Sequence, residues 1–168
     1  LPDGVGIAVG ATAPLFELKS VEGKLVELKG LLNQRAVMLF FIAALVTYCN
    51  FQVRKFTTLH AKFDKLGITL VGISVDELEG TLKVKKTYDV PFPLLSDPDA
   101  KVHDSYKVSN ELDAAGVERL AKFGLDVERW SKRKHHKIAI PSIFLIGKNG
   151  KVLFAHAARD YKTRPSEE

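Results

Sequence analysis

Sulfur-containing side chains are almost absent from this chain, whose 168 residues include one cysteine and one methionine. A single cysteine excludes an intramolecular disulfide and a zinc site made of cysteines alone. It does not define the cellular compartment, because reducing and oxidising locations both tolerate one free thiol. Any redox cycle at Cys49 therefore needs a thiol from another molecule.

Long hydrophobic runs are also lacking. The longest, from Val37 to Val46, is far shorter than the roughly 20 residues that a membrane-spanning helix needs. The sequence shows no signal peptide and no lipidation motif, so we expect a cytoplasmic protein without a membrane partner. The chain begins at Leu1 instead of Met, and we expect it to be trimmed or processed.

Several motifs that bind nucleotides, metals or acyl groups are missing. No P-loop and no Gly-x-Ser-x-Gly turn occurs. The glycine-rich start, Leu1 to Gly10, has no preceding strand and so is no dinucleotide fingerprint. His135 and His136 are adjacent, so their side chains point apart in a strand or loop, and no carboxylate or cysteine stands near them. We therefore expect no cofactor and no metal.

The basic character of the chain is local. The net charge is +5, and the segment from Arg129 to Lys137 alone holds five Lys or Arg residues and no acid. Such a segment could touch nucleic acid, but we interpret it as the solvated face of an insertion and expect no nucleic-acid partner. The length and the apolar content of 46% predict one domain, spanning residues 1–168.

The order of apolar patterns predicts an α/β fold. The strands at Ala36–Ala43, Ile68–Val75 and Ile143–Ile146 should share one mixed sheet with helices on both faces, because alternating strands and helices indicate parallel pairing. The other predicted elements are an N-terminal hairpin (Leu15–Leu18 and Leu25–Leu28), a turn at Gly30–Gln34, helices at Asp76–Tyr88 and Ala100–Tyr106, a helical insertion at Ser109–Lys137, and a hairpin turn at Lys148–Lys151 before an antiparallel strand at Val152–His156. The late strand is predicted over Ile138–Ile146 and is interrupted at Pro141.

Cys49 falls in the first turn of a predicted helix. Apolar residues recur from Cys49 to Leu66 at spacings of three and four, which is one face of a helix, and Gly67 can cap its end. The amides and the dipole at a helix start favour the thiolate, which is the nucleophile, and Thr47 is a candidate N-cap. Cys49 also lies on the core-facing stripe, so an inert buried thiol is the alternative.

Together these motifs resemble the peroxiredoxin and alkyl hydroperoxide reductase (AhpC/TSA, redoxin) group of the thioredoxin superfamily. The likeness rests on the order of elements, on Leu-Leu-Ser-Asp-Pro-Asp, and on Ile-Pro-Ser-Ile-Phe-Leu-Ile-Gly-Lys-Asn-Gly. It is strongest to peroxiredoxin-like bacterial proteins with Trp-Cys-Pro-Tyr-Cys-Asn at the turn, of which this chain keeps Tyr48-Cys49-Asn50, and later Phe154-Ala155-His156 and Asp160-Tyr161. The resemblance implies a thioredoxin fold.

The chain departs from the family pattern at the site itself. Leu45-Val46-Thr47 stands where those relatives have Trp-Cys-Pro, so the first cysteine of a Cys-x-x-Cys pair is missing. The motif of typical peroxiredoxins, Pro-x-x-x-Thr-x-x-Cys, maps onto Ile42, Val46 and Cys49, and only the cysteine is kept. The activating arginine of the family maps onto Pro141. We therefore expect a weakened site.

The resemblance still implies a site around Cys49. Peroxide reduction needs donors for the leaving oxygen, and backbone amides at Tyr48 and Cys49 could supply them, with Thr47 in place of the family threonine. Arg54, one turn along, could add positive potential, and such a group is worth a few kcal/mol in a transition state. The family proline is often cis, so we predict that Pro141 is cis and lies close to Cys49.

Two functions follow from this sequence. The first is a one-cysteine peroxiredoxin-like oxidoreductase, an antioxidant enzyme that acts on a peroxide or disulfide substrate with an external thiol as reductant and that could form a homodimer. The second is a redoxin fold that has lost catalysis and serves as a binding or structural module. The exposure of Cys49 decides between them, because burial disfavours the thiolate more than a helix start favours it.

Overall fold

The computed structural model describes residues 5–42, 47–75, 82, 85–86, 89–111, 114–115, 118, 137–140 and 142–157. Its helices are α1 (Leu28–Leu32), α2 (Thr47–Lys65) and α4 (Lys101–Ser105). Its strands are β1 (Glu17–Ser20), β2 (Leu25–Glu27), β3 (Ala36–Ile42), β4 (Ile68–Ser74), β5 (Leu94–Ser96), β6 (Ser109–Glu111), β7 (Lys137–Ala139), β8 (Ser142–Ile146) and β9 (Val152–Ala157).

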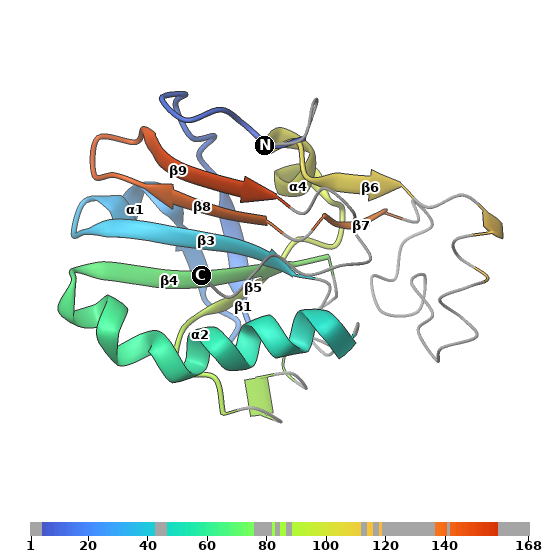
Figure 1. Cartoon of the computed structure of the whole chain (residues 1–168), viewed down its shortest axis with the longest axis horizontal. Coiled ribbons are helices and arrows are strands. Elements are labelled where there is room, and N and C mark those ends of the chain that lie inside the picture. Colours follow the sequence, from blue (N-terminus) through green and yellow to red (C-terminus); the bar gives the residue numbers. More distant parts are fainter. Residues whose placement is uncertain are drawn as a thin grey trace.

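Seven strands form one mixed sheet in the order β2-β1-β5-β4-β3-β8-β9 (Figure 1). Strand β4 pairs in parallel with β3 and with β5. All other neighbours in the sheet are antiparallel, including β8 and β9. The predicted mixed sheet, with its three named strands side by side and an antiparallel strand after the 148–151 turn, is confirmed.

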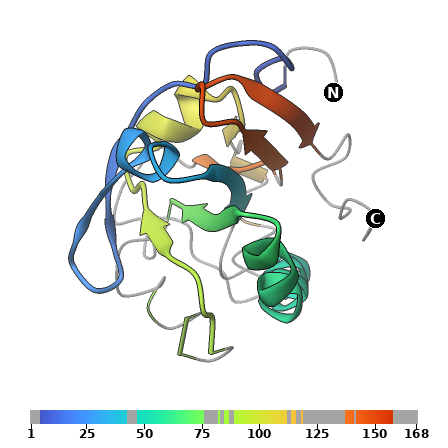
Figure 2. The same cartoon turned by 90° about the vertical axis from the view of Figure 1, so that its left-hand side faces the viewer.

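Strand β3 lies between β4 and β8 and is buried on both faces. Val37, Leu39 and Phe41 point into one core cluster, and Phe40 points into a second cluster on the other face. This alternation is the period of two that a strand imposes on its side chains. The first cluster lies against α1 and α4 and the second against α2, and in Figure 2 these helices flank opposite faces of the sheet.

Helix α2 covers the second face through aromatic contacts. Phe56 of α2 stacks on Phe40, with ring centroids 4.7 Å apart and planes at 22°. The predicted stripe holds at Phe56 and at the partly buried Phe63, but Leu66 is 72% exposed because it follows the end of the helix. Gly67, with φ of +76°, takes the left-handed conformation predicted for the helix end.

The N-terminal hairpin is confirmed as β1 and β2, with β1 starting two residues later than predicted, but the segment after it differs from the prediction. Leu28 is the first residue of α1 and is fully buried, not the last residue of a strand. Leu28 and Leu32, four residues apart, place their side chains in the core from one helical face. The predicted turn at Gly30–Gln34 is therefore largely helical.

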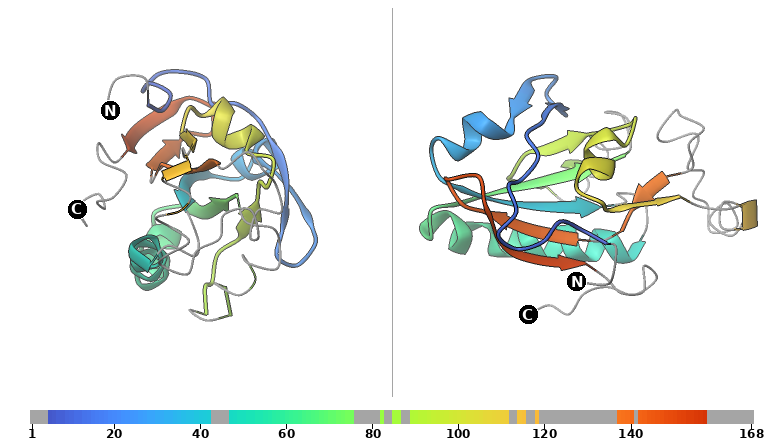
Figure 3. Two further views of the ribbon diagram at one scale, coloured as in Figure 1. Left: turned by 90° about the vertical axis from the view of Figure 1, so that its right-hand side faces the viewer. Right: turned by 90° about the horizontal axis from the view of Figure 1, so that it is seen from above.

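The predicted helical insertion starts and ends as strands. Ser109–Glu111 (β6) and Lys137–Ala139 (β7) pair antiparallel in a separate two-stranded sheet, which Figure 3 shows beyond the end of the main sheet. Within the insertion only 114–115 and 118 are described, and they are helical. Most of the predicted Asp76–Tyr88 helix also lies outside the described residues, where 82 and 85–86 are helical.

The turn at 148–151 forms as predicted. Gly150 has φ of +81°, and Asn149 Oδ1 accepts the amide of Lys151 at 3.0 Å. A bulge between Leu145 and Ile146 follows from the register of β8 and β9. No helix in the described part of the chain is long and apolar enough to cross a membrane.

Candidate functional site

The helix that carries Cys49 starts at the carboxyl end of β3. Strand β3 ends at Ile42, helix α2 begins at Thr47, and Cys49 is its third residue. The first amides of a helix have no partner within the helix, and the macrodipole is positive there. The prediction that Cys49 lies in the first helical turn is confirmed for the backbone.

The first turn of α2 brings three predicted site residues together. Thr47, Tyr48 and Cys49 are its first three residues. Thr47 was predicted as the residue before the helix and is instead the first helical one, a shift within the usual uncertainty of helix ends. The side chains of residues 47–53 lie outside the described set, so the predicted roles of these three side chains stay predictions.

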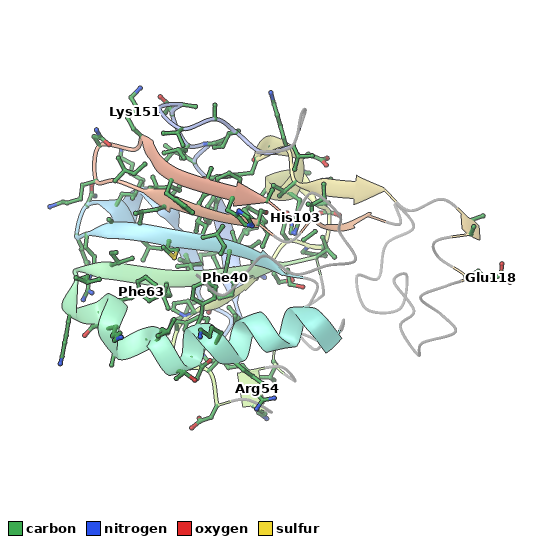
Figure 4. The ribbon with its side chains drawn as sticks, in the orientation of Figure 1. Phe40, Arg54, Phe63, His103, Glu118 and Lys151 are labelled. Atoms are coloured by element: carbon green, nitrogen blue, oxygen red, sulfur yellow. The ribbon has the colours of Figure 1, made fainter. Side chains whose placement is uncertain are left out.

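Arg54 and Pro141 are placed less closely. Arg54 has an exposed side chain on α2 and lies on the side of the helix away from β4 (Figure 4). Pro141 lies outside the described residues, and so do its predicted cis bond and its contact with Cys49. The next residue, Ser142, pairs with Phe41 near the end of β3, so β8 starts at this same edge of the sheet.

Three parallel strands end at this edge. Ile42 pairs with Ser74, and Ser74 pairs with Ser96, so β3, β4 and β5 stop at the same level. In open α/β sheets, ligands bind outside the carboxyl ends of the strands. The thiol helix therefore starts at the edge where such folds place their sites, which we call the carboxyl edge.

A buried acid–imidazole pair lies directly below the carboxyl edge. Asp97 follows β5, and its amide donates to the carbonyl of Ser74 at 2.7 Å. Asp97 Oδ2 lies 2.7 Å from Nδ1 of His103, and the two side chains are 3% and 0% exposed. The ring of His103 packs on Phe41 of β3 in a T-shaped contact, with centroids 4.9 Å apart. Figure 4 shows His103 by the ends of the strands.

Two buried side-chain nitrogens have no hydrogen-bond partner, within the described part of the chain. Both are histidine Nε2 atoms, one in His103 and one in His156. His156 is paired with Ile143 in the last part of β9, one register step from the Ser142–Ala157 pair. Two imidazoles thus lie near the carboxyl edge. The sequence placed His156 in a strand, and placed His103 on a helix as a surface or satisfied core residue.

The Asp97–His103 pair was missed as a site from the sequence. The signal was the acidic Ser96-Asp97-Pro98-Asp99 start before a helix, which predicts a carboxylate that accepts amides of the first turn. That part holds, because Asp97 Oδ2 accepts the amides of Val102 and His103, each at 3.0 Å. No local pattern in the sequence indicates that the ring of His103 bonds to the same oxygen.

A metal centre has no support from the described residues. No three His, Cys, Asp or Glu side chains among them lie close enough to hold an ion. His135 and His136 lie outside that set.

The sequence matches a known family over most of its length. Residues 9–155 fit the model of the AhpC/TSA family. A peroxiredoxin named bcp from Coxiella burnetii is 31% identical over 104 residues, which are 62% of this chain and 69% of that protein. The chloroplast peroxiredoxin Q of Sedum lineare is 36% identical over 106 residues, 63% of this chain and 57% of that protein. The chain thus matches less than two thirds of the plant relative.

Solved structures give the same fold. The peroxidoxin BcpB of Mycobacterium tuberculosis superposes with a TM-score of 0.73 at 25% identity, over 90% of this chain and 86% of that one. A mutant of the PrxQ of Xylella fastidiosa superposes with a TM-score of 0.73 at 20% identity, over 92% and 87% of the two chains. The second likeness supports the fold alone, and the thioredoxin fold predicted from the sequence is confirmed.

Proposed function

Because the chain belongs to the AhpC/TSA family and is a peroxiredoxin-like member of the thioredoxin superfamily, we propose that it is a thiol peroxidase that uses Cys49 alone. Its relatives are named peroxiredoxins, which classes the chain with thiol peroxidases. The observation that carries the proposal is the position of Cys49 as third residue of α2, at the carboxyl edge of the sheet. No second cysteine exists in the chain, so an external thiol closes the cycle.

In the first step the Cys49 thiolate attacks one oxygen of a hydroperoxide. The S–O bond forms as the O–O bond breaks, and the departing oxygen leaves as water or an alcohol after taking up a proton. Sulfur is oxidised to sulfenic acid and the peroxide is reduced. Amides of Tyr48 and Cys49, at the positive end of α2, stabilise the charge on the departing oxygen.

In the second step an external thiol condenses with the sulfenic acid. Water leaves, and a mixed disulfide with Cys49 remains. A second thiol then attacks this disulfide, so Cys49 returns to the thiol and the two external thiols leave as their own disulfide. Each turnover consumes one peroxide and two thiols.

The neighbouring side chains have narrower roles in this proposal. Thr47 donates to the peroxide in place of the family threonine, whose position holds Val46, and Arg54 adds positive potential from the next turn. In the sequence, Pro141 stands where the family has its arginine. Since a cation and a hydroxyl of the family pattern are replaced, the reaction with peroxide should be slower than in typical members.

The test is peroxide consumption by the purified chain with dithiothreitol, glutathione or thioredoxin as reductant. The expected result is turnover with at least one reductant, together with trapping of the sulfenic acid on Cys49 by dimedone, seen by mass spectrometry. Cys49→Ser should abolish both signals. A chain that is folded, but neither consumes peroxide nor reacts with dimedone, would instead be a binding module that has lost catalysis.

The substrate, location and assembly are finer parts of the proposal. Hydrogen peroxide and cumene hydroperoxide compared at equal concentration distinguish a small-peroxide enzyme from one that prefers organic peroxides. The cytoplasmic location, the single domain over 1–168 and the homodimer stay predictions. Cell fractionation, limited proteolysis and light scattering test them in that order.

A further inference from the structure

The proposed chemistry leaves the buried Asp97–His103 pair without a role. The two side chains are 3% and 0% exposed, and Oδ2 lies 2.7 Å from Nδ1. Buried charged groups are costly unless they are paired and hydrogen-bonded. The pair thus forms part of the interior below the carboxyl edge, where the Cys49 helix starts.

Asp97 fixes the orientation of the His103 ring. Its Oδ2 accepts the backbone amides of Val102 and His103, each at 3.0 Å, as well as the ring contact at Nδ1. Because this oxygen already accepts two amides, we assign the hydrogen of the ring contact to Nδ1. The amide of Asp97 is itself tied to the carbonyl of Ser74, at the end of β4. The ring is therefore held against the backbone of two elements.

The other side of the His103 ring lies on Phe41. The two rings meet at 74° with centroids 4.9 Å apart. Phe41 is fully buried and is the last residue but one of β3. Thr47, the first residue of α2, follows Phe41 by six positions in the chain.

Packing alone does not explain a histidine at this place. Its Nε2 is buried and has no hydrogen-bond partner among the described residues. Leucine or phenylalanine would cover Phe41 without leaving a bare nitrogen in the interior, and buried polar groups without partners are rare enough to need a reason. A fixed ring orientation is what the imidazole provides and an aliphatic side chain does not, since only the imidazole can bond to Asp97.

We infer that His103, held by Asp97, is a positioning residue for Cys49. It acts through Phe41, whose ring it fixes, and so sets the geometry of the end of β3 from which the thiol helix starts. This inference rests on Cys49 being the reactive group of the proposed function. It does not require that the substrate be a peroxide.

The test measures the reactivity of Cys49 without any peroxide. Iodoacetamide labelling of the folded chain, followed by mass spectrometry from pH 6 to pH 10, gives both the rate constant and the midpoint of its pH profile. His103→Asn keeps a donor for Asp97 but removes the ring from Phe41. We expect this variant to change the labelling rate about tenfold and to move the midpoint, since small displacements of a reacting group can cost up to ~100-fold in rate.

The matched control is Val152→Ala. Val152 is 1% exposed and belongs to the same core cluster, but it pairs with Ile146 at the opposite edge of the sheet. It should lower stability and leave the pH profile of Cys49 unchanged. If His103→Asn and Val152→Ala both leave the profile as in the parent chain, His103 is a structural residue and the inference is wrong.

A second measurement uses the unchanged chain and covers the case in which His103→Asn does not fold. Two-dimensional NMR of the five histidine rings is recorded before and after Cys49 is alkylated. The His103 ring is recognised by its Nδ1 proton, which should be the most protected among the histidines. Its nitrogen chemical shifts should change when Cys49 is alkylated. Unchanged chemical shifts of His103 would overturn the inference. If labelling depends on His103 but no peroxide is consumed, the positioning role stands and the peroxidase proposal fails.

Discussion

Gly72 of β4 and Leu94 of β5 are register partners packed so closely that a Cβ at position 72 would lie 2.7 Å from Cδ2 of Leu94. This Cβ at position 72 would also lie 3.1 Å from the ring of Phe40. Both neighbours are fully buried, so neither can move aside cheaply. Because Gly72 has no side chain, Leu94 and Phe40 can pack directly against the backbone of β4.

Gly72→Ala should therefore destabilise the fold. We expect a loss of about 1–3 kcal/mol in the free energy of unfolding, the usual range for overpacking a core, measured by urea denaturation. Gly30→Ala is the control, because nothing lies within 4 Å of its Cβ and it sits in α1. That change should stabilise the chain by up to ~1 kcal/mol, and an equal effect of the two substitutions would contradict the packing argument.

The contact between Phe40 and Phe56 gives a second prediction, about the thiol helix. Phe56 is 8% exposed and stacks on Phe40, which is fully buried. Phe56→Ala should lower the free energy of unfolding by about 3–5 kcal/mol and weaken the packing of α2, which carries Cys49, against the sheet. Urea denaturation measures the free energy of unfolding, and hydrogen exchange of the α2 amides reports how firmly the helix packs on the sheet.

Phe63→Ala provides the comparison on the same helix. Phe63 is only partly buried, and its ring centroid lies 6.1 Å from that of Phe56. Its loss should cost clearly less than the loss of Phe56. Similar costs for both would mean that the helix is not anchored through Phe40.

Local patterns in the sequence were enough to predict the centre of the fold. The ten-residue apolar run from Val37, which overlaps β3, predicts a buried strand because both faces of such a strand are covered. The α2 stripe follows from spacing alone, and among its described side chains it fails at Leu66, which lies beyond the last helical residue. Asn149-Gly150 predicts its turn because glycine readily takes a positive φ.

Elements that depend on distant partners were not predictable in this way. Helix α1 is five residues long with Gly30 at its centre, so its helicity comes from burying Leu28 and Leu32 and not from propensity. Strand β6 forms by pairing with β7 across a long insertion, whereas most of β7 falls in the strand predicted from Ile138. The hydrogen bond between Asp97 and the His103 ring depends on where α4 lies relative to the end of β5, which local sequence patterns do not determine.

A third prediction concerns the ion pair between Glu22 and Lys85. Lys85 Nζ lies 2.6 Å from Glu22 Oε1, with side chains 23% and 50% exposed. The hydrogen bond from Lys85 holds the pKa of Glu22 below its usual value. A lowered carboxyl pKa stabilises the fold above the unfolded pKa of about 4.3, and this contribution disappears as the pH falls through the folded value.

Lys85→Met should therefore have a small and pH-dependent effect. We expect a loss of at most ~1 kcal/mol at neutral pH, because exposed ion pairs are weak and screened by salt. The difference from the parent chain should shrink below about pH 4 and at high salt. Lys86→Met makes the same charge change at the next, exposed residue, and its effect should not depend on acid pH in this way.

The last prediction concerns Tyr106, whose hydroxyl donates to the carbonyl of Pro14 at 2.7 Å. Burial raises the pKa of Tyr106 well above its ordinary value, so the folded state keeps the phenol proton where the unfolded chain loses it, above about pH 10. The folded state then binds more protons than the unfolded one, and stability must fall as the pH rises, by up to ~1.4 kcal/mol per pH unit. Below about pH 10 the ionisation of Tyr106 does not change the stability with pH.

Tyr106→Phe separates the hydrogen bond from the titration. At neutral pH the variant should lose about 1 kcal/mol, the usual net worth of one hydrogen bond, because Pro14 keeps its carbonyl without the donor. Between about pH 10 and pH 11.5 the parent chain should lose stability more steeply than the variant, so their urea midpoints converge. Other groups that titrate in this range contribute equally to both chains and cancel in the difference. Parallel curves would show that Tyr106 ionises in the folded state as readily as in the unfolded chain, and would contradict the burial of its hydroxyl against Pro14.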